Sequence, residues 1–142
     1  MKALLDTGPW VALIDRSEDA HATCVKWFAS FSGKLFSTEA VLTEVLYLLN
    51  FSLKAQQSAL DFVIRGVVTL VPSDANSLRF ARSQMEKYAD LPMDFADATL
   101  VCLAAESGIL NIVTLDHKDF YIYRTAGNQV FRILPGEEQV KR

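Results

Sequence analysis

The chain has 142 residues, a length that suits one domain with a single core and leaves little room for a second folding unit. Hydrophobic residues make up 51% of the sequence and charged residues 22%, which excludes wholesale disorder. The formal net charge of -3 excludes a protein that binds a nucleic-acid duplex through charge alone, so any nucleic-acid contact must be local. We expect residues 1–142 to form one domain.

Membrane, secretory and zinc-binding proteins are also disfavoured. No apolar run approaches the roughly 20 residues that cross a bilayer, and the acid at position 6 comes too early for a signal peptide. We therefore expect a cytoplasmic protein without a membrane partner. Cys24 and Cys102 are far apart and lie in apolar helical stretches, which predicts buried free thiols. The two histidines have no His or Cys partner at metal-ligand spacing, which argues against a structural zinc site.

Apolar periodicity and turn signals alternate along the chain between strands and helices. In chain order they predict a strand at 2–6, helices from position 7 and at 20–31, a strand at 35–36, helices at 38–50 and 53–65, a strand at 67–71, helices at 74–89 and 94–107, and strands at 111–114 and 130–134. Strands separated by helices of this length need crossover connections, which indicates a mainly parallel sheet covered on both faces. The expected fold is therefore a three-layer α/β domain, whose ligand crevice lies at the carboxyl ends of the strands.

The helix expected after Ser73 or Asp74 has an amphipathic pattern. Its apolar residues recur at helical spacing and are placed on one face, namely Leu78, Ala81, Met85 and either Tyr88 or Ala89.

Two carboxylates follow predicted strands directly. Asp6 ends the first strand and Asp116 follows the strand at 111–114, so both are expected at the same edge of a parallel sheet. Each also has a purely structural alternative: Asp6 can cap the helix that follows, and Asp116 can shape a turn.

Two further acids lie on apolar faces of predicted helices. The residues three, four or seven positions from Glu44 are Ala40, Val41, Tyr47, Leu48 and Phe51, and those from Asp97 are Leu100, Val101 and Ala104. Glu44 and Asp97 are therefore expected to point inward, with Asp94 one turn before Asp97. The alternative is that Asp94 and Asp97 only stabilise the start of their helix.

Convergence of Asp6, Glu44, Asp97 and Asp116 requires a cation. Two carboxylates at ~4 Å repel by roughly 4 kcal/mol at an effective dielectric near 20, while a whole domain is stable by only about 5–15 kcal/mol. The apolar helices offer almost no Lys or Arg near Glu44 or Asp97. Ligands that are all oxygen favour Mg²⁺ or Mn²⁺, and such ions commonly act on phosphate esters, so the pattern predicts phosphodiester hydrolysis.

Four segments resemble one known family in order and spacing, across nearly the whole chain. They are Leu4-Leu5-Asp6-Thr7-Gly8, Thr38-Glu39-x-Val41-x-Thr43-Glu44, Met93-Asp94-Phe95-Ala96-Asp97-Ala98 and Thr114-Leu115-Asp116-x-x-Asp119-Phe120. This arrangement is similar to the PIN-domain ribonucleases, especially the VapC-type toxins of toxin–antitoxin pairs. The resemblance implies a three-layer α/β/α domain with a parallel sheet of strand order 3-2-1-4-5 and an endoribonuclease site that depends on Mg²⁺ or Mn²⁺.

The resemblance also implies roles for individual acids. The catalytic set it implies is Asp6 as the first metal ligand, Glu44 as the inward helix acid, Asp97 as the acid of the Asp-Ala motif and Asp116 as the acid after the fourth strand. Of these, Asp6, Asp97 and Asp116 are the expected metal ligands. Asp119 is expected to order the following turn, and Asp94 either completes the site or caps its helix.

Contacts outside the acids are less distinctive. Thr7 and Thr114 can orient ligands or water through their hydroxyls, or serve structure alone. The cations Lys118, Arg124 and Arg132 can contact phosphate, although plain surface solvation fits each of them better. The resemblance further implies an RNA substrate, a homodimer and a small cognate antitoxin that occupies the cleft.

Three other functions fit the sequence less well. A haloacid-dehalogenase-type phosphatase needs Asp-x-Asp, where this chain has Asp6-Thr7-Gly8, and a nucleotide-binding module needs a glycine-rich phosphate loop that the sequence lacks. The remaining alternative is a non-catalytic PIN-like domain that binds RNA or protein. A metal titration separates it from a nuclease, because only a metal site gains stability from the ion.

Overall fold

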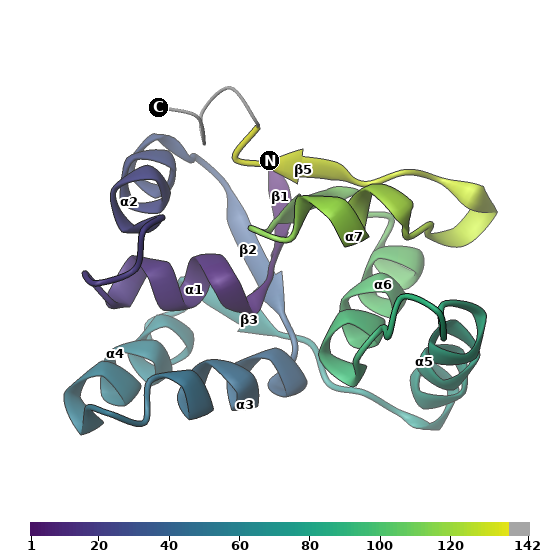
Figure 1. Ribbon diagram of the computed structural model, residues 1–142, viewed down its shortest axis with the longest axis horizontal. Coiled ribbons are helices and arrows are strands. Elements are labelled where there is room, and N and C mark those ends of the chain that lie inside the picture. The colour runs from purple at the N-terminus through teal and green to yellow at the C-terminus, as the bar shows by residue number, and fades with distance from the viewer. Residues whose placement is uncertain (137–142) are drawn as a thin grey trace.

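A five-stranded parallel sheet with helices on both faces forms the centre of the computed structural model, which describes residues 1–136 (Figure 1). The elements in chain order are β1 (Lys2–Leu5), α1 (Thr7–Ile14), α2 (His21–Ser30), β2 (Lys34–Ser37), α3 (Glu39–Leu48), α4 (Leu53–Ile64), β3 (Val68–Leu70), α5 (Ala75–Lys87), α6 (Phe95–Ser107), β4 (Asn111–Val113), α7 (His117–Ile122), the 3-10 helix η1 (Ala126–Asn128) and β5 (Arg132–Leu134). The strand order is β3-β2-β1-β4-β5 and every pairing is parallel. The predicted three-layer fold and strand order are therefore confirmed, while residues 137–142 of the expected domain lie outside the described residues.

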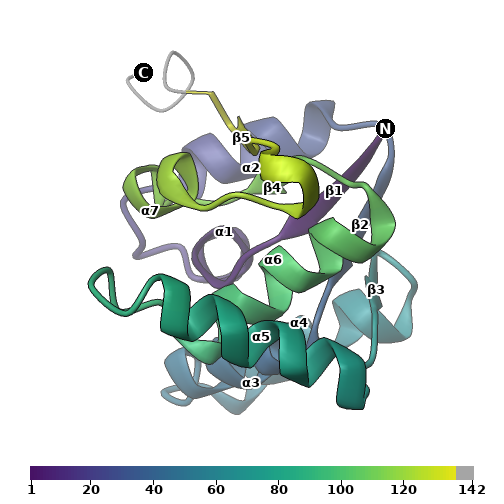
Figure 2. The same ribbon diagram turned by 90° about the vertical axis from the view of Figure 1, so that its right-hand side faces the viewer.

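The helices divide into two layers. Helices α1 to α4 lie on one side of the sheet, and α5 and α6 lie on the other, as Figures 1 and 2 show from two directions. Strand β1 pairs with both β2 and β4 and so lies at the centre of the sheet. Helices α3 and α6 contact each other although they belong to different layers. None of the helices in residues 1–136 combines the length and apolarity needed to cross a membrane.

The core follows from the apolar composition of the central elements. Leu4 and Leu5 of β1 and Ile112 and Val113 of β4 are almost fully buried, and burial of each such side chain stabilises the fold by about 1.5–3 kcal/mol. Helix α6 is buried on every side from Ala98 to Ala104, because it lies between the sheet and α5. Cys24 and Cys102 are buried free thiols, as predicted.

Two predicted helix faces differ from the observed ones. For α5 the prediction holds in part: Ala81 and Tyr88 are buried as expected, while Leu78 and Met85 are 47% and 38% exposed. Ser77, which the prediction did not include, is buried. The small side chains let α5 pack closely on α6, which rotates the larger apolar residues toward solvent. On α3 the core-facing residues are Val41 and Val45, whereas the residues used to infer an inward Glu44 include three that are exposed, namely Tyr47, Leu48 and Phe51.

A side-chain cap begins each of the α-helices in residues 1–136 except α2. The caps that accept a backbone N–H are Asp6 for α1, Thr38 for α3, Ser52 for α4, Asp74 for α5, Asp94 for α6 and Asp116 for α7. Asp6, Asp94 and Asp116 therefore cap helices, which is the structural role that the sequence left open for each of them. Each of these three also lies at a helix N-terminus, where the aligned peptide dipoles favour a negative charge.

Candidate metal centre

The predicted acids come from four separate parts of the chain and meet at the carboxyl edge of the sheet. Asp6 follows β1, Glu44 lies on α3, Asp97 lies in the first turn of α6, and Asp116 precedes α7. Their charges are close enough to act on two of the acids: Glu44 and Asp116 raise the pKa of Asp6, and Asp6 and Asp116 raise the pKa of Asp97. The structure therefore brings all four predicted residues into one electrostatic cluster.

Asp6 forms the buried base of the site. Its Oδ1 accepts the backbone N–H of Thr7 at 2.8 Å, and its Oδ2 accepts the hydroxyl of Thr114 at 2.7 Å. The side chain is only 8% exposed, and this burial, followed by the charges of Glu44 and Asp116, raises its pKa to about 6. The two hydrogen bonds oppose the shift without cancelling it, so the carboxylate is held in place at an electrostatic cost.

Thr114 links the ends of the two central strands. Its hydroxyl donates to Asp6 and accepts the backbone N–H of Asp116 at 2.9 Å, and the residue is fully buried. Thr114 therefore fixes the orientation of the Asp6 carboxylate and ties it to the backbone of Asp116.

Replacing this hydroxyl should weaken the fold measurably. Thr114→Val keeps the shape but leaves a carboxylate oxygen and an N–H without partners, so we expect a loss of about 2–3 kcal/mol in the free energy of unfolding. Thr125→Val is the matched control, because the Thr125 hydroxyl is buried and has no hydrogen-bond partner in the described part of the chain. Urea denaturation of both variants measures the difference, and equal losses would contradict the role given to Thr114.

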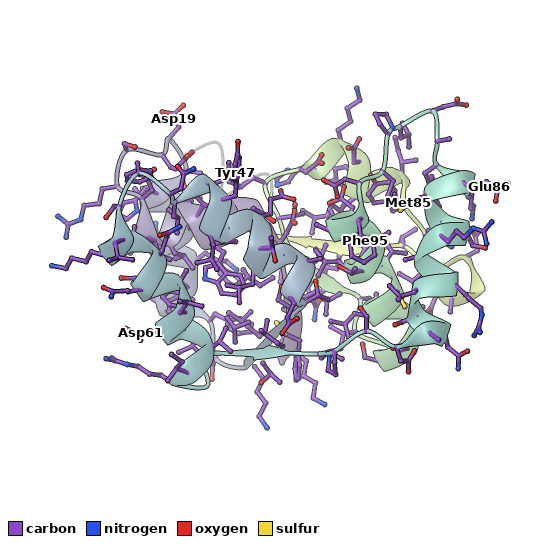
Figure 3. All side chains as sticks on the ribbon, turned by 90° about the horizontal axis from the view of Figure 1, so that it is seen from below. Asp19, Tyr47, Asp61, Met85, Glu86 and Phe95 are labelled. Carbon is purple, nitrogen blue, oxygen red and sulfur yellow. The ribbon has the colours of Figure 1, made fainter. Side chains whose placement is uncertain are left out.

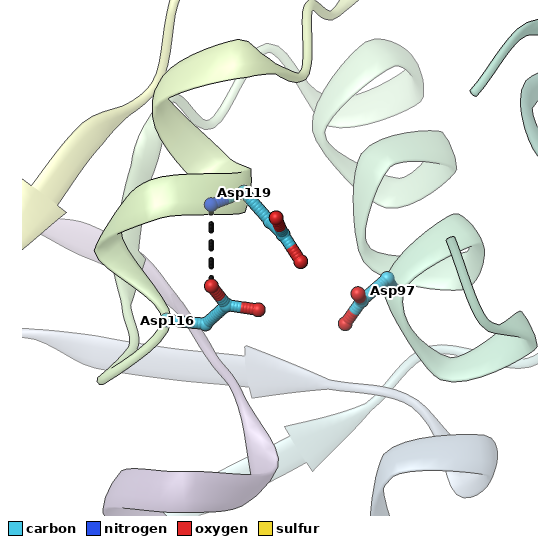
Figure 4. Close-up of side chains that lie close together, drawn as sticks. All are labelled: Asp97, Asp116 and Asp119. Carbon is cyan, nitrogen blue, oxygen red and sulfur yellow. Dashed lines mark hydrogen bonds between the residues drawn. The ribbon is translucent and has the colours of Figure 1, made fainter. Parts of the chain in front are cut away.

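Asp97, Asp116 and Asp119 form the tightest group of carboxylates. One oxygen from each lies within 4.8 Å of the others, and Figure 4 shows the three side chains pointing toward one another. Burial, together with the charges of Asp6 and Asp94, raises the pKa of Asp97 to about 8. The hydroxyl of Tyr123 donates to its Oδ2 at 3.2 Å. Two of the three predicted metal ligands therefore lie within this group, and Asp6 lies close beside it.

The third member of the group, Asp119, was expected only to order a turn. It lies in the first turn of α7, where its backbone N–H donates to Asp116 Oδ1 at 3.2 Å. Burial and the adjacent Asp116 raise its pKa. Helix α7 was not predicted, so whether Asp119 joins the site stayed open at the level of the sequence. Its spacing three positions after Asp116, which is typical of a cap and the first turn of a helix, was the available signal.

Glu44 and Asp94 complete the acidic cluster on its other side. Glu44 is half-buried, and its pKa is raised by burial and then by the charge of Asp94. The nearby Thr7 hydroxyl lowers the pKa of Glu44 and so offsets part of this rise. Thr7 Oγ1 is buried and makes no hydrogen bond of standard geometry within the described residues. Asp94 accepts the backbone N–H of Asp97 at 2.8 Å. Asp94 therefore caps its helix and also contributes charge to the cluster.

No cation of residues 1–136 is among the groups that shift the pKa of Asp6, Glu44 or Asp97. Carboxylates separated from one another, or neutralised by arginine and lysine, would have contradicted a metal site. Neither arrangement is observed for these three acids in the described part of the chain.

The cations singled out near the end of the chain have different positions. Lys118 lowers the pKa of Asp119 and so acts on the cluster. The Arg124 guanidinium donates to the backbone carbonyls of residues 121–123 and closes the end of α7. Arg132 pairs in register with the first residue of β4, so it lies toward the opposite edge of the sheet from the acids.

The donor set fits a hard divalent cation. The groups that face one another are carboxylate oxygens, and the unpartnered Thr7 hydroxyl adds a buried polar atom beside them. A bound divalent ion would offset the repulsion that raises the pKa values of Asp6 and Asp97. With such an ion bound, the site could neutralise and orient a phosphate ester at the carboxyl edge of the sheet.

The fold and the site together define a class of small α/β/α domains with an acidic centre at the ends of the parallel strands. The chain belongs to the PIN domain family, whose sequence model matches residues 3–127. No curated protein matches the chain at a significant level.

Solved structures share this fold. VapC20 from Mycobacterium tuberculosis, described as a toxin that cleaves the sarcin-ricin loop, has a TM-score of 0.72 and 24% identity, with 78% of this chain and 86% of that chain covered. VapBC2 from Rickettsia felis, bound to a DNA fragment from its promoter, has a TM-score of 0.65 and 18% identity, covering 94% and 98%. FitAcB from Neisseria gonorrhoeae has a TM-score of 0.62 and 16% identity, covering 92% and 96%.

Proposed function

We propose that residues 1–142 act as a single cytoplasmic PIN domain and that this domain is an endoribonuclease dependent on Mg²⁺ or Mn²⁺. The observation that carries the proposal is the convergence of Asp6, Glu44, Asp97 and Asp116, without a neutralising cation in residues 1–136 among the groups acting on Asp6, Glu44 and Asp97. A protein that bound RNA or another protein passively would gain nothing from this repulsion. It would lose stability by keeping it.

Four acids are proposed to hold the metal. Asp97, Asp116 and Asp119 supply oxygens from the tight group, and Asp6 supplies its carboxylate from the buried base, directly or through water. A bound Mg²⁺ or Mn²⁺ supplies charge neutralisation of the phosphodiester, a lower pKa for water and stabilisation of the leaving oxygen.

Glu44 is proposed to orient or deprotonate the attacking water. It is half-buried, its pKa is raised, and it faces the cluster from α3, opposite the acids of α6. A carboxylate with a raised pKa accepts a proton more readily at neutral pH than an exposed one. Attack of water on phosphorus, with cleavage of the bond to the 3′-oxygen and protonation of that leaving oxygen, gives a 5′-phosphate and a 3′-hydroxyl on the products.

The biological role proposed is that of the toxin of a type II toxin–antitoxin system. The similarity in fold to VapC20, described as a toxin, and to VapBC2 supports this role. It brings with it a cognate antitoxin as protein partner and a homodimer as the working assembly. A short neighbouring reading frame that encodes a DNA-binding protein would support the toxin role over that of a housekeeping nuclease.

Incubation with total cellular RNA tests the activity directly. With Mg²⁺ or Mn²⁺ we expect discrete fragments, and an excess of chelator should abolish them. End mapping should find 5′-phosphates at the new ends. Intact RNA in every metal condition would contradict the proposal and favour the non-catalytic alternative, as would cleavage that chelation leaves unchanged.

A further inference from the structure

An exposed aromatic ring lies beside the acidic cluster. Phe95 is the first residue of α6, directly after Asp94 and two positions before Asp97, and 43% of it is exposed. Figure 3, which views the molecule from below Figure 1, shows Phe95 near the middle of this face, between α3 and α5. A ring exposed to this extent presents an aromatic surface that a ligand can contact.

The ring faces a groove of about 470 Å³. Its lining residues are Glu39, Ala40 and Thr43 of α3, residues 70–73 and Phe95 itself. This volume admits a planar group stacked on the ring together with the atoms that connect it to a neighbouring phosphate.

The groove adjoins the acidic cluster along α3. Ala40 and Thr43 lie four and one positions before Glu44, so the three share one side of the helix. Glu44 on that side acts electrostatically on the cluster through Asp94, the residue next to Phe95. A strand of RNA with its phosphate at the acids can therefore place an adjacent base in the groove.

The charge of the groove favours a base over a phosphate. Its charged lining residue is the exposed Glu39, and no lysine, arginine or histidine of residues 1–136 lines it. An anionic phosphate is repelled here, whereas the carboxylate of Glu39 can accept hydrogen bonds from an exocyclic amine. An aromatic face with a nearby acceptor is the chemistry by which proteins hold unstacked bases of single-stranded RNA.

We propose that Phe95 is a stacking platform for one unpaired, amine-bearing nucleobase next to the scissile phosphate. This inference rests on the proposed ribonuclease function and adds a substrate class to it: single-stranded RNA with adenine, cytosine or guanine at that position. Uracil, which has no exocyclic amine, is the disfavoured base. The ring acts on binding and takes no part in the chemistry.

Cleavage kinetics on short single-stranded RNA with Mg²⁺ test the platform. Phe95→Ala should raise KM about tenfold, the size expected for one base stacked on an aromatic ring, with kcat nearly unchanged. Phe95→Trp should keep the KM of the unaltered protein, whereas Phe95→Leu should resemble Phe95→Ala, because it keeps apolar volume without a π face. Phe51→Ala, which removes an exposed ring elsewhere, is the matched control and should have no effect. An unchanged KM in Phe95→Ala, or full rescue by leucine, overturns the proposal.

A binding measurement separates this inference from the nuclease proposal. RNA that carries 2-aminopurine at successive positions is titrated with Asp97→Asn protein in Mg²⁺, and stacking should quench one position. Adding Phe95→Ala should remove that quenching. If the unaltered protein cuts no RNA, the nuclease proposal fails, while the quenching still decides whether Phe95 binds a base. If Phe95→Ala instead changes the mass measured by light scattering, the ring is a protein contact and the platform is rejected.

Discussion

Asp97→Asn is expected to abolish metal-dependent RNA cleavage and to stabilise the metal-free protein at the same time. Asp97 lies in the tight carboxylate group, and its pKa of about 8 reflects the cost of its charge beside Asp6 and Asp94. The amide removes that charge and can still accept the hydroxyl of Tyr123. A metal supplies several kcal/mol to phosphodiester cleavage, so we expect a loss of at least about a thousandfold in rate.

Lower activity together with higher stability would be specific for the loss of a metal ligand. A substitution that merely damages the fold lowers both activity and stability, whereas removal of a metal ligand lowers activity and raises the melting temperature in chelator. Asp19→Asn is the control, because Asp19 is an exposed acid in the segment between α1 and α2 and should change neither measurement. Unimpaired cleavage by Asp97→Asn, or a lowered melting temperature in chelator, would refute the role given to this residue.

The free energy of unfolding in chelator should fall as the pH rises from 5 to 8. Asp6 and Asp97 have folded-state pKa values of about 6 and about 8, both above the ordinary value of 3.8. Between these values the folded protein binds more protons than the unfolded chain, so raising the pH favours unfolding. The stability that these two carboxyl groups contribute is fully present below pH ~4, and it is lost as the pH rises through their folded-state pKa values. We expect a decrease of about 2–4 kcal/mol, measured by urea denaturation in chelator.

Added metal should reverse most of this loss at pH 8. Mg²⁺ or Mn²⁺ binds the ionised carboxylates of the folded state and so stabilises it by mass action. Asp97→Asn should flatten the pH profile in chelator, since it removes the larger of the two shifts. The exposed acids with lowered pKa values, Asp15 and Asp74, titrate below this window and do not disturb it. A stability that rises between pH 5 and 8, or that ignores added metal, would show that the cluster is not a metal site.

Local sequence signals predicted most of the fold because most helices and strands have a cap or turn residue at each end and a regular spacing of apolar residues between them. Asp94 and Gly108 bound α6 as expected, and Gly108 adopts the left-handed conformation that only glycine takes easily. The apolar period failed for α3, where Tyr47 and Leu48 fit the same stripe as buried valines but are exposed. A helix with apolar residues around most of its circumference does not show which side its neighbours cover.

The sequence predicted that the site is acidic, but it did not predict every carboxylate that belongs to it. Asp6, Glu44, Asp97 and Asp116 could be singled out because acids after strands or among apolar helix residues are unusual. Asp119 was named in the fourth motif, but its place in the site could not be predicted because it depends on α7, a short helix with little periodicity of its own. The link from Thr114 to Asp6 spans 108 positions in the sequence, and no local pattern reports such a contact.

The sequence by itself determined the order of strands and helices up to β4, the parallel sheet and the acids at its carboxyl edge, because these follow from periodicity, caps and crossover length. Only the tertiary structure decided which carboxylates face one another, how deeply each is buried and which aromatic ring stands beside them. Burial and charge proximity are properties of packing between distant segments, and they set the pKa values of Asp6 and Asp97. The chemistry proposed for this protein therefore depends on contacts that form only when α3, α6 and α7 close around the ends of β1 and β4.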